Sequence, residues 1–282
     1  MIAIPGPALS KYETGIAANT GNPKVSAVII TYNEEHNIRR TLSQLHWCDE
    51  IIIVDSNSTD KTVAICKAFG CKVLTRDFDG YGPQKRFAVA QASNDWILCI
   101  DADEVLTDKL VAEIGAAMAD STAWSGLSFR MNMVFLNKEF RYGKESGRFF
   151  LRLYNRNHGG FTDDKVHESI RVKGPVKKLQ HTIRHYSYTS LHQCLEKCNR
   201  YSTYSAEMAF KKGKKKSVLA VLFGLPFNFF KYYLLERNCL NGLNGFYWSV
   251  FSTYYHFAKY VKIRELHKNH KKQPKPTSLN IA

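Results

Sequence analysis

The chain has 282 residues, of which 44% are hydrophobic and 23% charged. It is long enough to bury a substantial core, which excludes a disulfide-stapled miniprotein and an intrinsically disordered chain. No run of about 18 uncharged apolar residues occurs, which argues against an ordinary membrane-spanning helix. The seven cysteines form no C-x-x-C pair and no zinc-type spacing with histidine, so we expect a reduced, cytoplasmic protein.

The net charge of +15 is divided unevenly along the chain. Residues 1–125 carry 11 Lys and Arg against 16 Asp and Glu, whereas residues 126–282 carry 29 against 9. This division predicts a basic second half that faces an anionic partner: phosphate, nucleic acid or a cytoplasmic membrane leaflet. Nucleic acid is disfavoured, because no recognition signature is present and the basic clusters adjoin apolar aromatic segments.

The first half alternates strands with helices. Residues 1–23, rich in Pro and Gly, are expected to form a flexible leader. Strands are expected at residues 25–30, 51–54, 72–75 and 96–100, and helices at 34–45, 60–70 and 85–92. Continuous apolar strands in such an alternation predict a parallel sheet covered by helices on both faces.

Polar residues follow three of these strands directly: Asn33, Asp55, and the pair Asp101 and Asp103. Ligands of open α/β sheets bind beyond the carboxyl ends of the strands. The spacing of Asp101 and Asp103 allows both carboxylates to converge on one Mg²⁺ or Mn²⁺ and a diphosphate. The alternative is that both acids form a turn before a helix capped by Thr107.

The second half is expected to begin with short strands at residues 126–133 and 148–154 and to become helical from about residue 190 to beyond 260. A basic run, residues 211–216, precedes an aromatic-rich apolar segment, residues 218–235. We predict that residues 211–260 attach the protein peripherally to an anionic membrane surface. The alternative is that these helices pack on the first domain or in a homodimer.

Four sequence motifs occur in order along the first half of the chain: VSAVIITYNEEHNI, IIIVDSNSTD, PQKRFAVAQA and WILCIDADE. They resemble the family-2 glycosyltransferases with a GT-A fold. The later segments KVHESI, RHYSYTS and LNGLNGF are similar to the branch that contains lipopolysaccharide-core β-glucosyltransferases. The resemblance implies an α/β, Rossmann-like GT-A catalytic domain, which we expect over residues 24–189. The sequence pattern predicts a helical membrane-associating region over 190–266 and a basic disordered tail over 267–282.

The resemblance also implies an inverting, metal-dependent transfer of a sugar from a nucleotide donor to a hydroxyl. We expect UDP-glucose as donor and a glycolipid acceptor, such as the lipopolysaccharide inner core, at the cytoplasmic face of the inner membrane. The same chemistry on a capsule or lipid-linked oligosaccharide acceptor stays open, because fold alone does not decide function.

By position in the motifs, Thr31, Asn33 and Asp55 would line the nucleotide pocket, with Asp55 accepting the N–H of a uracil-type base. The alternative for Asp55 is an Asx-turn in Asp-Ser-Asn-Ser. Lys85 matches a basic residue near the donor, although Arg86 stands where the family usually has Asn.

Asp103 matches the metal-binding acid of the D-x-D motif, Asp101 its donor-side partner, and His185 the downstream histidine that completes the metal shell. Glu104 is expected to be structural or to act indirectly. Arg148 is expected near the acceptor, together with Arg152, where both would meet an anionic group or remain solvated.

Glu168, in the segment VHE, matches the general base of the family. An inverting transfer needs a carboxylate that takes the proton of the acceptor hydroxyl. His167 replaces the first member of the acidic pair found in related enzymes, so Asp163 and Asp164 remain alternative bases.

Overall fold

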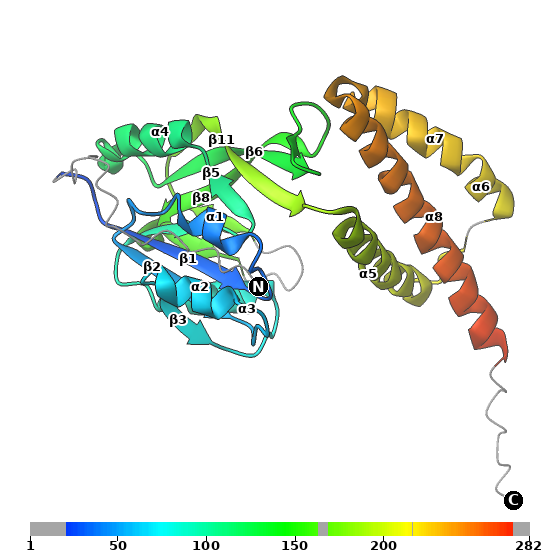
Figure 1. The fold of residues 1–282 in the computed structure, drawn as a ribbon, viewed down its shortest axis with the longest axis horizontal. Helices are drawn as coiled ribbons and strands as arrows, with labels where there is room; N and C mark the ends of the chain where they lie inside the picture. Colours follow the sequence, from blue (N-terminus) through cyan, green and yellow to red (C-terminus); the bar gives the residue numbers. More distant parts are fainter. Residues whose placement is uncertain (1–20, 163–168, 216, 273–282) are drawn as a thin grey trace, which may run out of the picture.

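The computed structural model describes residues 21–162, 169–215 and 217–272. An α/β domain comes first, and a group of helices follows it and extends away from the sheet (Figure 1). The predicted α/β class with a C-terminal helical extension is therefore confirmed.

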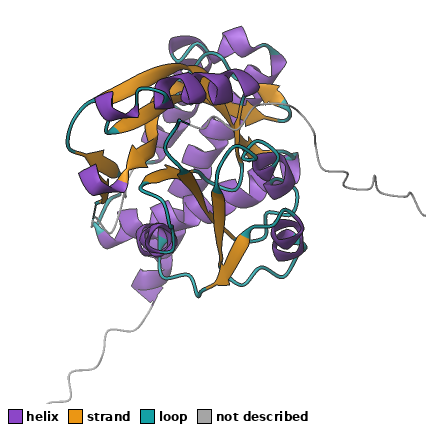
Figure 2. Ribbon diagram, turned by 90° about the vertical axis from the view of Figure 1, so that its left-hand side faces the viewer, coloured by secondary structure: helices purple, strands orange, loops and turns teal. Residues whose placement is uncertain are grey.

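The first four strands pair in parallel, in the order β3-β2-β1-β4. The strands are β1 (Val25–Thr31), β2 (Glu50–Asp55), β3 (Lys72–Thr75) and β4 (Trp96–Cys99), and the helices between them are α1 (Ile38–Leu42), α2 (Thr62–Ala68) and α3 (Tyr81–Ala90). The view in Figure 2 shows the strands between flanking helices. The predicted parallel alternation is confirmed by the parallel pairing of these strands, and β1 and β4 are buried along most of their length, as expected for a sheet covered on both faces.

Local signals explain where several helices begin and end. Gly70 has φ +75° and follows α2, a backbone conformation that glycine adopts without strain. The Thr107 hydroxyl accepts a hydrogen bond from the Leu110 amide and caps α4 (Asp108–Met118), as predicted. α3 begins before its predicted start, since Pro83 fits the first turn of a helix, where it costs no hydrogen bond.

The rest of the main sheet is mixed. β8 (Ser146–Asn155) pairs antiparallel with β4 and with β6 (Gly126–Phe135), while β6 runs parallel to β11 (Val176–Tyr188). β5 (Glu104–Leu106) closes the far edge, antiparallel to β11. The smaller elements are β7 (Lys138–Glu139), β9 (Gly159–Phe161), β10 (Ile170–Val172), η1 (Ser121–Ala123) and η2 (Arg156–His158).

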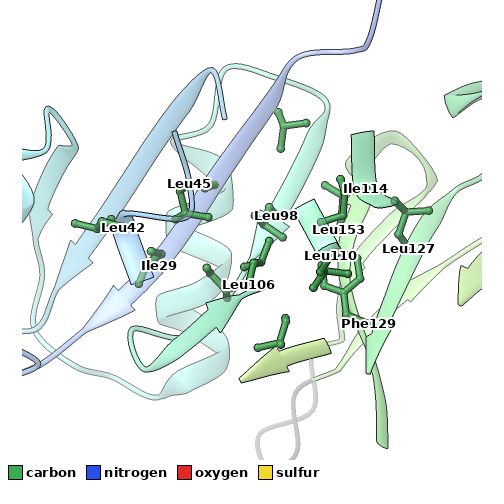
Figure 3. Packing of buried hydrophobic residues seen from close by; sticks show 14 of the residues in the cluster. Ile29, Leu42, Leu45, Leu98, Leu106, Leu110, Ile114, Leu127, Phe129 and Leu153 are labelled. Carbon is green, nitrogen blue, oxygen red and sulfur yellow. The ribbon is translucent and has the colours of Figure 1, made fainter. Parts of the chain in front are cut away.

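The core lies on both faces of the sheet. On one face Ile29, Leu98 and Phe129 pack against α1 and α4 (Figure 3). On the other face Val28 and Ile97 pack against α3. Since successive side chains of a strand point to opposite faces, one apolar run supplies both clusters.

The helical extension contains α5 (Leu191–Lys211), α6 (Val218–Leu222), α7 (Gly224–Phe230), the π-turn η3 (Lys231–Leu235), the 3₁₀ turn η4 (Asn238–Asn241) and α8 (Leu243–Lys272). The predicted disordered tail from residue 267 begins too early, because α8 continues to Lys272. Within the described ranges, no helix has both the length and the apolar character needed to cross a membrane.

The segment LNGLNGF connects the extension to the α/β domain through side-chain hydrogen bonds. The Asn241 side chain accepts from the Arg141 amide at 3.1 Å and donates to the Tyr142 carbonyl at 3.0 Å. Asn244 donates to the Phe135 carbonyl at 3.0 Å. Next to these bonds, Trp248 of α8 packs edge-on against the buried Phe135 ring, so part of α8 contributes to the domain core.

Candidate active site

The sheet order reverses beside β1, which has β2 on one side and β4 on the other. Thr31 lies opposite Asp55 in the register of β1 and β2, and Asp101 follows β4. The fold therefore brings the predicted donor residues to one edge of the sheet, at the switch point where open α/β sheets bind ligands.

On the nucleotide side, the predicted residues organise a loop. The Asp55 carboxylate accepts from the Ser58 amide at 2.8 Å and from its hydroxyl at 2.5 Å. Asp55 therefore holds the loop after β2 through the third residue on, whereas an Asx-turn bonds the second. Asn33 (φ 52°) accepts from the Thr59 amide at 2.8 Å. The Thr31 hydroxyl is buried and has no hydrogen-bond partner among the described residues.

Asp101 lies between two cations. Lys85, buried on α3, places Nζ 3.0 Å from Asp101 Oδ1, and Arg152 of β8 places a guanidinium nitrogen 3.4 Å from Oδ2. Arg152 also forms an ion pair with Glu104, whose second oxygen accepts from the Asp101 amide at 3.1 Å. Arg152 is thus neither solvated nor free for the acceptor, and Glu104 has the structural role that the sequence analysis expected.

Burial and charge oppose each other in this network. Burial alone raises the pKa of Asp101, but Lys85 and Arg152 outweigh it and hold that pKa well below its usual range. Burial alone lowers the pKa of Lys85, yet the charge of Asp101 raises it overall. For Glu104 burial dominates and raises the pKa despite Arg152. The ionised Asp101 is therefore neutralised by protein groups.

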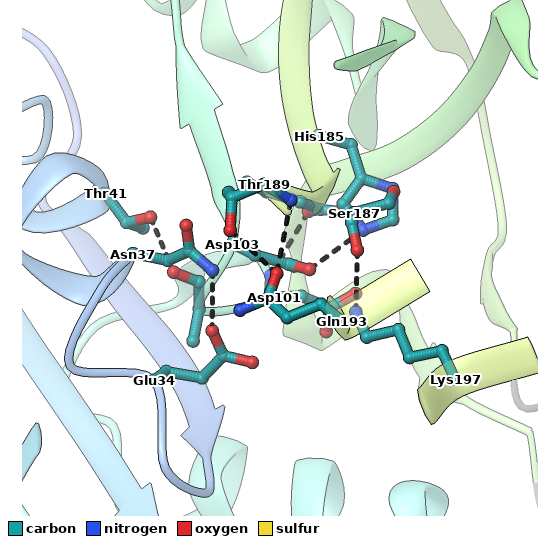
Figure 4. Close-up of polar contacts among 12 residues, drawn as sticks. Glu34, Asn37, Thr41, Asp101, Asp103, His185, Ser187, Thr189, Gln193 and Lys197 are labelled. Carbon is teal, nitrogen blue, oxygen red and sulfur yellow. Dashed lines mark hydrogen bonds and ion pairs between the residues drawn. The ribbon is translucent and has the colours of Figure 1, made fainter. Parts of the chain in front are cut away.

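The other predicted pair, Asp103 and His185, also comes together. His185 Nε2 lies 3.2 Å from Asp103 Oδ2 (Figure 4). The antiparallel pairing of β11 with β5 creates this contact, because the Tyr186 amide donates to the Asp103 carbonyl at 2.8 Å. On the other side of the turn, the Thr41 hydroxyl donates to the Ala102 carbonyl at 2.7 Å. The turn that carries Asp103 is therefore held from two elements.

His185 responds to this environment. Burial lowers the pKa of an imidazole, but the charge and hydrogen bond of Asp103 outweigh it and raise the pKa of His185 to about 9. A divalent cation would replace that proton as the partner of both side chains.

Glu34 is a site residue that the sequence analysis missed. Its carboxylate accepts from the Asn37 side chain at 2.8 Å on the loop after β1 (Figure 4). Burial and the nearby Asp103 raise the pKa of Glu34. Its position just beyond the end of β1 in TYNEE was the available signal.

Two of the predicted metal ligands, Asp103 and His185, lie close enough to share one cation. In the described part of the chain, no three His, Cys, Asp or Glu side chains gather in a metal-binding arrangement. Mg²⁺ and related ions are commonly held by one or two protein ligands, with substrate phosphates and water completing the shell. Asp103 and His185 fit that mode of binding, whereas Asp101 is already paired with protein cations.

The predicted base and its alternatives, Glu168, Asp163 and Asp164, lie outside the described residues. Arg148 is exposed on β8 and its guanidinium lies 5.2 Å from the Phe150 ring centroid.

Comparison with known proteins places the chain in a family. Residues 26–172 match the model of glycosyl transferase family 2. The chain is 35% identical over 235 residues to an uncharacterized glycosyltransferase of Rickettsia felis, which covers 79% of this chain and 83% of that protein. It is 30% identical over 229 residues to the lipopolysaccharide core biosynthesis glycosyltransferase LpsC of Rhizobium meliloti, covering 79% and 85%. The chain therefore belongs to glycosyltransferase family 2 and resembles its LpsC branch, as predicted.

Two solved structures are similar over a shorter part. TarS 1–349 of Staphylococcus aureus in complex with UDP-GlcNAc has a TM-score of 0.31 at 22% identity, covering 40% of this chain and 34% of that chain. Glucosyl-3-phosphoglycerate synthase from Mycobacterium tuberculosis has a TM-score of 0.32 at 23% identity, covering 42% and 46%. The family assignment rests on the sequence relatives.

Proposed function

We propose that this enzyme transfers glucose from UDP-glucose, with inversion, to a hydroxyl of a lipopolysaccharide inner-core glycolipid. The observation that carries the proposal is the meeting of Asp103 with His185, and of Lys85 with Asp101, at the switch point of a family-2 glycosyltransferase. The similarity to LpsC supports the acceptor class. The same chemistry on a capsule or lipid-linked oligosaccharide acceptor is the alternative.

Asp103 and His185 would hold a divalent cation, Mg²⁺ or Mn²⁺. Such a cation neutralises the charge that develops on a departing diphosphate. Lys85, oriented by Asp101, adds a fixed positive charge beside the same site, and it costs no reorganisation because Asp101 already holds it at 3.0 Å.

Thr31, Asn33 and Asp55 would line the nucleotide pocket. The buried, unpartnered Thr31 hydroxyl supports this, since a buried polar atom costs free energy unless a partner satisfies it. Asn33 and Asp55 would act by holding the loop of Ser58 in place for the base.

We propose Glu168 as the general base. In an inverting transfer the acceptor oxygen forms a bond to the anomeric carbon while the bond from that carbon to the diphosphate oxygen breaks. The acceptor proton passes to the carboxylate, and UDP departs with the bonding electron pair. The proposed place of this reaction is the cytoplasmic face of the inner membrane, with the protein bound peripherally.

The test is a product assay with the purified protein, a panel of labelled UDP-sugars and lipopolysaccharide truncated at the inner core. We expect glucose transfer in Mg²⁺ or Mn²⁺, a β linkage by NMR and loss of activity in excess EDTA. Asp95→Asn, which alters an exposed carboxylate on the same domain, is the matched control for Asp103→Asn. Full activity in EDTA would refute the metal assignment, and transfer only to another acceptor would refute the inner-core assignment.

A further inference from the structure

An open cavity of about 510 Å³ lies in the helical extension between α5, α6 with α7, and α8. Its lining residues all belong to the helical extension, so the cavity is separate from the candidate active site (Figure 1). Cavities of roughly 300–1,000 Å³ are the usual size for small-molecule sites.

A specific helix ending places lysines at this cavity. Gly213 adopts φ +65° after α5, and its amide donates to the Phe210 carbonyl at 2.8 Å, while the Lys214 amide donates to the Ala209 carbonyl at 3.0 Å. This pair of bonds is the Schellman motif, which ends a helix and turns the chain. Lysines on both sides of the turn, Lys212, Lys214 and Lys215, therefore line the cavity.

Two further bonds fix this turn against α8. The Tyr260 hydroxyl donates to the Ser217 carbonyl at 2.8 Å, and the His267 ring lies 3.1 Å from the Lys214 carbonyl. The segment that carries the lysines is therefore held against α8 and forms one wall of the cavity.

The lining has two kinds of surface. The described lining residues include four lysines, because Lys259 of α8 joins the three at the turn. They include no carboxylate. The remaining wall is largely apolar, with Val221, Leu225 and Ile263 among its members. This combination fits a molecule that joins an anionic group to a hydrocarbon chain.

The surface beside the cavity is apolar and exposed. Phe223 is 73% exposed and Leu235 75% exposed, and Leu222, Phe227 and Phe230 of α6 and α7 are exposed as well. Exposed apolar side chains on short helices, with basic residues nearby in the chain, are typical of helices that lie in a membrane interface. The charge of the lysines is complementary to an anionic leaflet.

We propose that this cavity binds one anionic phospholipid of the membrane, with its phosphate at Lys212, Lys214 and Lys215 and an acyl chain along the apolar wall beside Val221. The exposed face of α6 and α7 enters the interface next to it. The site is a discrete lipid site, distinct from general adsorption to a charged surface, and it does not depend on the proposed sugar transfer.

The experiment measures binding of the full chain to phosphatidylcholine vesicles with and without phosphatidylglycerol, and titrates soluble dihexanoyl-phosphatidylglycerol below its micelle concentration. Val221→Trp fills the cavity, and Val250→Trp, the same substitution at an exposed position of α8 outside the lining, is the matched control. Lys212→Gln with Lys215→Gln is compared with Lys211→Gln plus Lys268→Gln, which removes equal charge from exposed positions outside the lining.

We expect selective binding to phosphatidylglycerol and one bound short-chain lipid per chain. The cavity lysine pair should weaken vesicle binding about 30-fold, and Val221→Trp about tenfold, with much smaller effects in both controls. Equal losses in the cavity variants and their controls would overturn the site in favour of general adsorption. If glycerol 3-phosphate competes as well as the short-chain lipid, the ligand is a free phosphate and the proposal fails.

The lysine variants keep the proposal testable if Val221→Trp does not fold, since they alter only exposed side chains. Sugar transfer to a detergent-dispersed acceptor should be unchanged in every variant. If the unchanged protein transfers sugar but binds no lipid, the lipid site is refuted and the proposed function stands. If it binds lipid but transfers no sugar, the proposed function is refuted and the lipid site stands.

Discussion

Arg152→Met tests the network that supports Asp101. The Glu104 side chain is 1% exposed; it forms an ion pair with Arg152 and accepts a hydrogen bond from the Asp101 amide. Methionine retains much of the volume and removes the charge. The variant therefore leaves a buried carboxylate with one hydrogen bond.

The variant can avoid a buried, unpaired charge by protonating Glu104. The free-energy cost of that protonation therefore limits the loss of stability. From an ordinary pKa of 4.5, protonation at pH 7 costs about 3.4 kcal/mol, at about 1.36 kcal/mol per pH unit. We expect a loss of about 3 kcal/mol in the free energy of unfolding at pH 7, near the ~3–5 kcal/mol typical of a broken buried pair. At pH 5 the same step costs only about 0.7 kcal/mol.

Proton linkage determines how the loss of stability in Arg152→Met changes with pH. Arg152 lowers the pKa of Glu104 in the folded protein, so its removal raises that pKa further above the unfolded value. The folded variant then binds the extra proton, and the penalty is absent below about pH 4.5. It grows as the pH rises towards the folded-state pKa. The loss in Arg152→Met should therefore increase from pH 5 to pH 7.

The free energy of unfolding is measured at pH 5 and pH 7 by urea titration in EDTA, followed by tryptophan fluorescence. Arg148→Met, an exposed arginine on the same strand, should change stability by less than about 0.5 kcal/mol. Glu104→Gln combined with Arg152→Met should recover most of the loss, since the buried carboxylate that lost its cation is removed as well. A loss below about 1 kcal/mol at pH 7, or a loss independent of pH, would refute the reasoning.

Three further outcomes are expected. Asp103→Asn should lower kcat about 100-fold or more with an unchanged circular dichroism spectrum, because the cation site loses its carboxylate; normal turnover would remove Asp103 from that site. Glu168→Gln should lower kcat by about 10²–10⁴ while UDP-glucose binding, measured by calorimetry, is retained; if Asp164→Asn has this effect instead, Asp164 is the base. Gly245→Ala should cost about 1–3 kcal/mol in urea unfolding, because its methyl group would overlap a backbone carbonyl of η4; Gly115→Ala, in open space within α4, should be neutral or stabilising.

Much of the fold and part of the site were predictable because their signals are local. The continuous apolar runs of β1, β2 and β4 and the turn residues after them determine a parallel sheet with Asp55 and Asp101 at one edge. Motif order was enough to pair His185 with Asp103 as a hypothesis, and the structure brings the two side chains within 3.2 Å of each other.

The burial of Arg152 was decided only by the tertiary structure. In the sequence it is one of many arginines in a basic half, but β8 pairs with β4 and places it against Asp101 and Glu104. Likewise, Asn241 belongs to the motif LNGLNGF, but only the folded chain brings it to its partner, the Arg141 amide. A side chain's charge and size are local properties, whereas its burial and its partners depend on contacts between segments distant in the chain, which local periodicity does not encode.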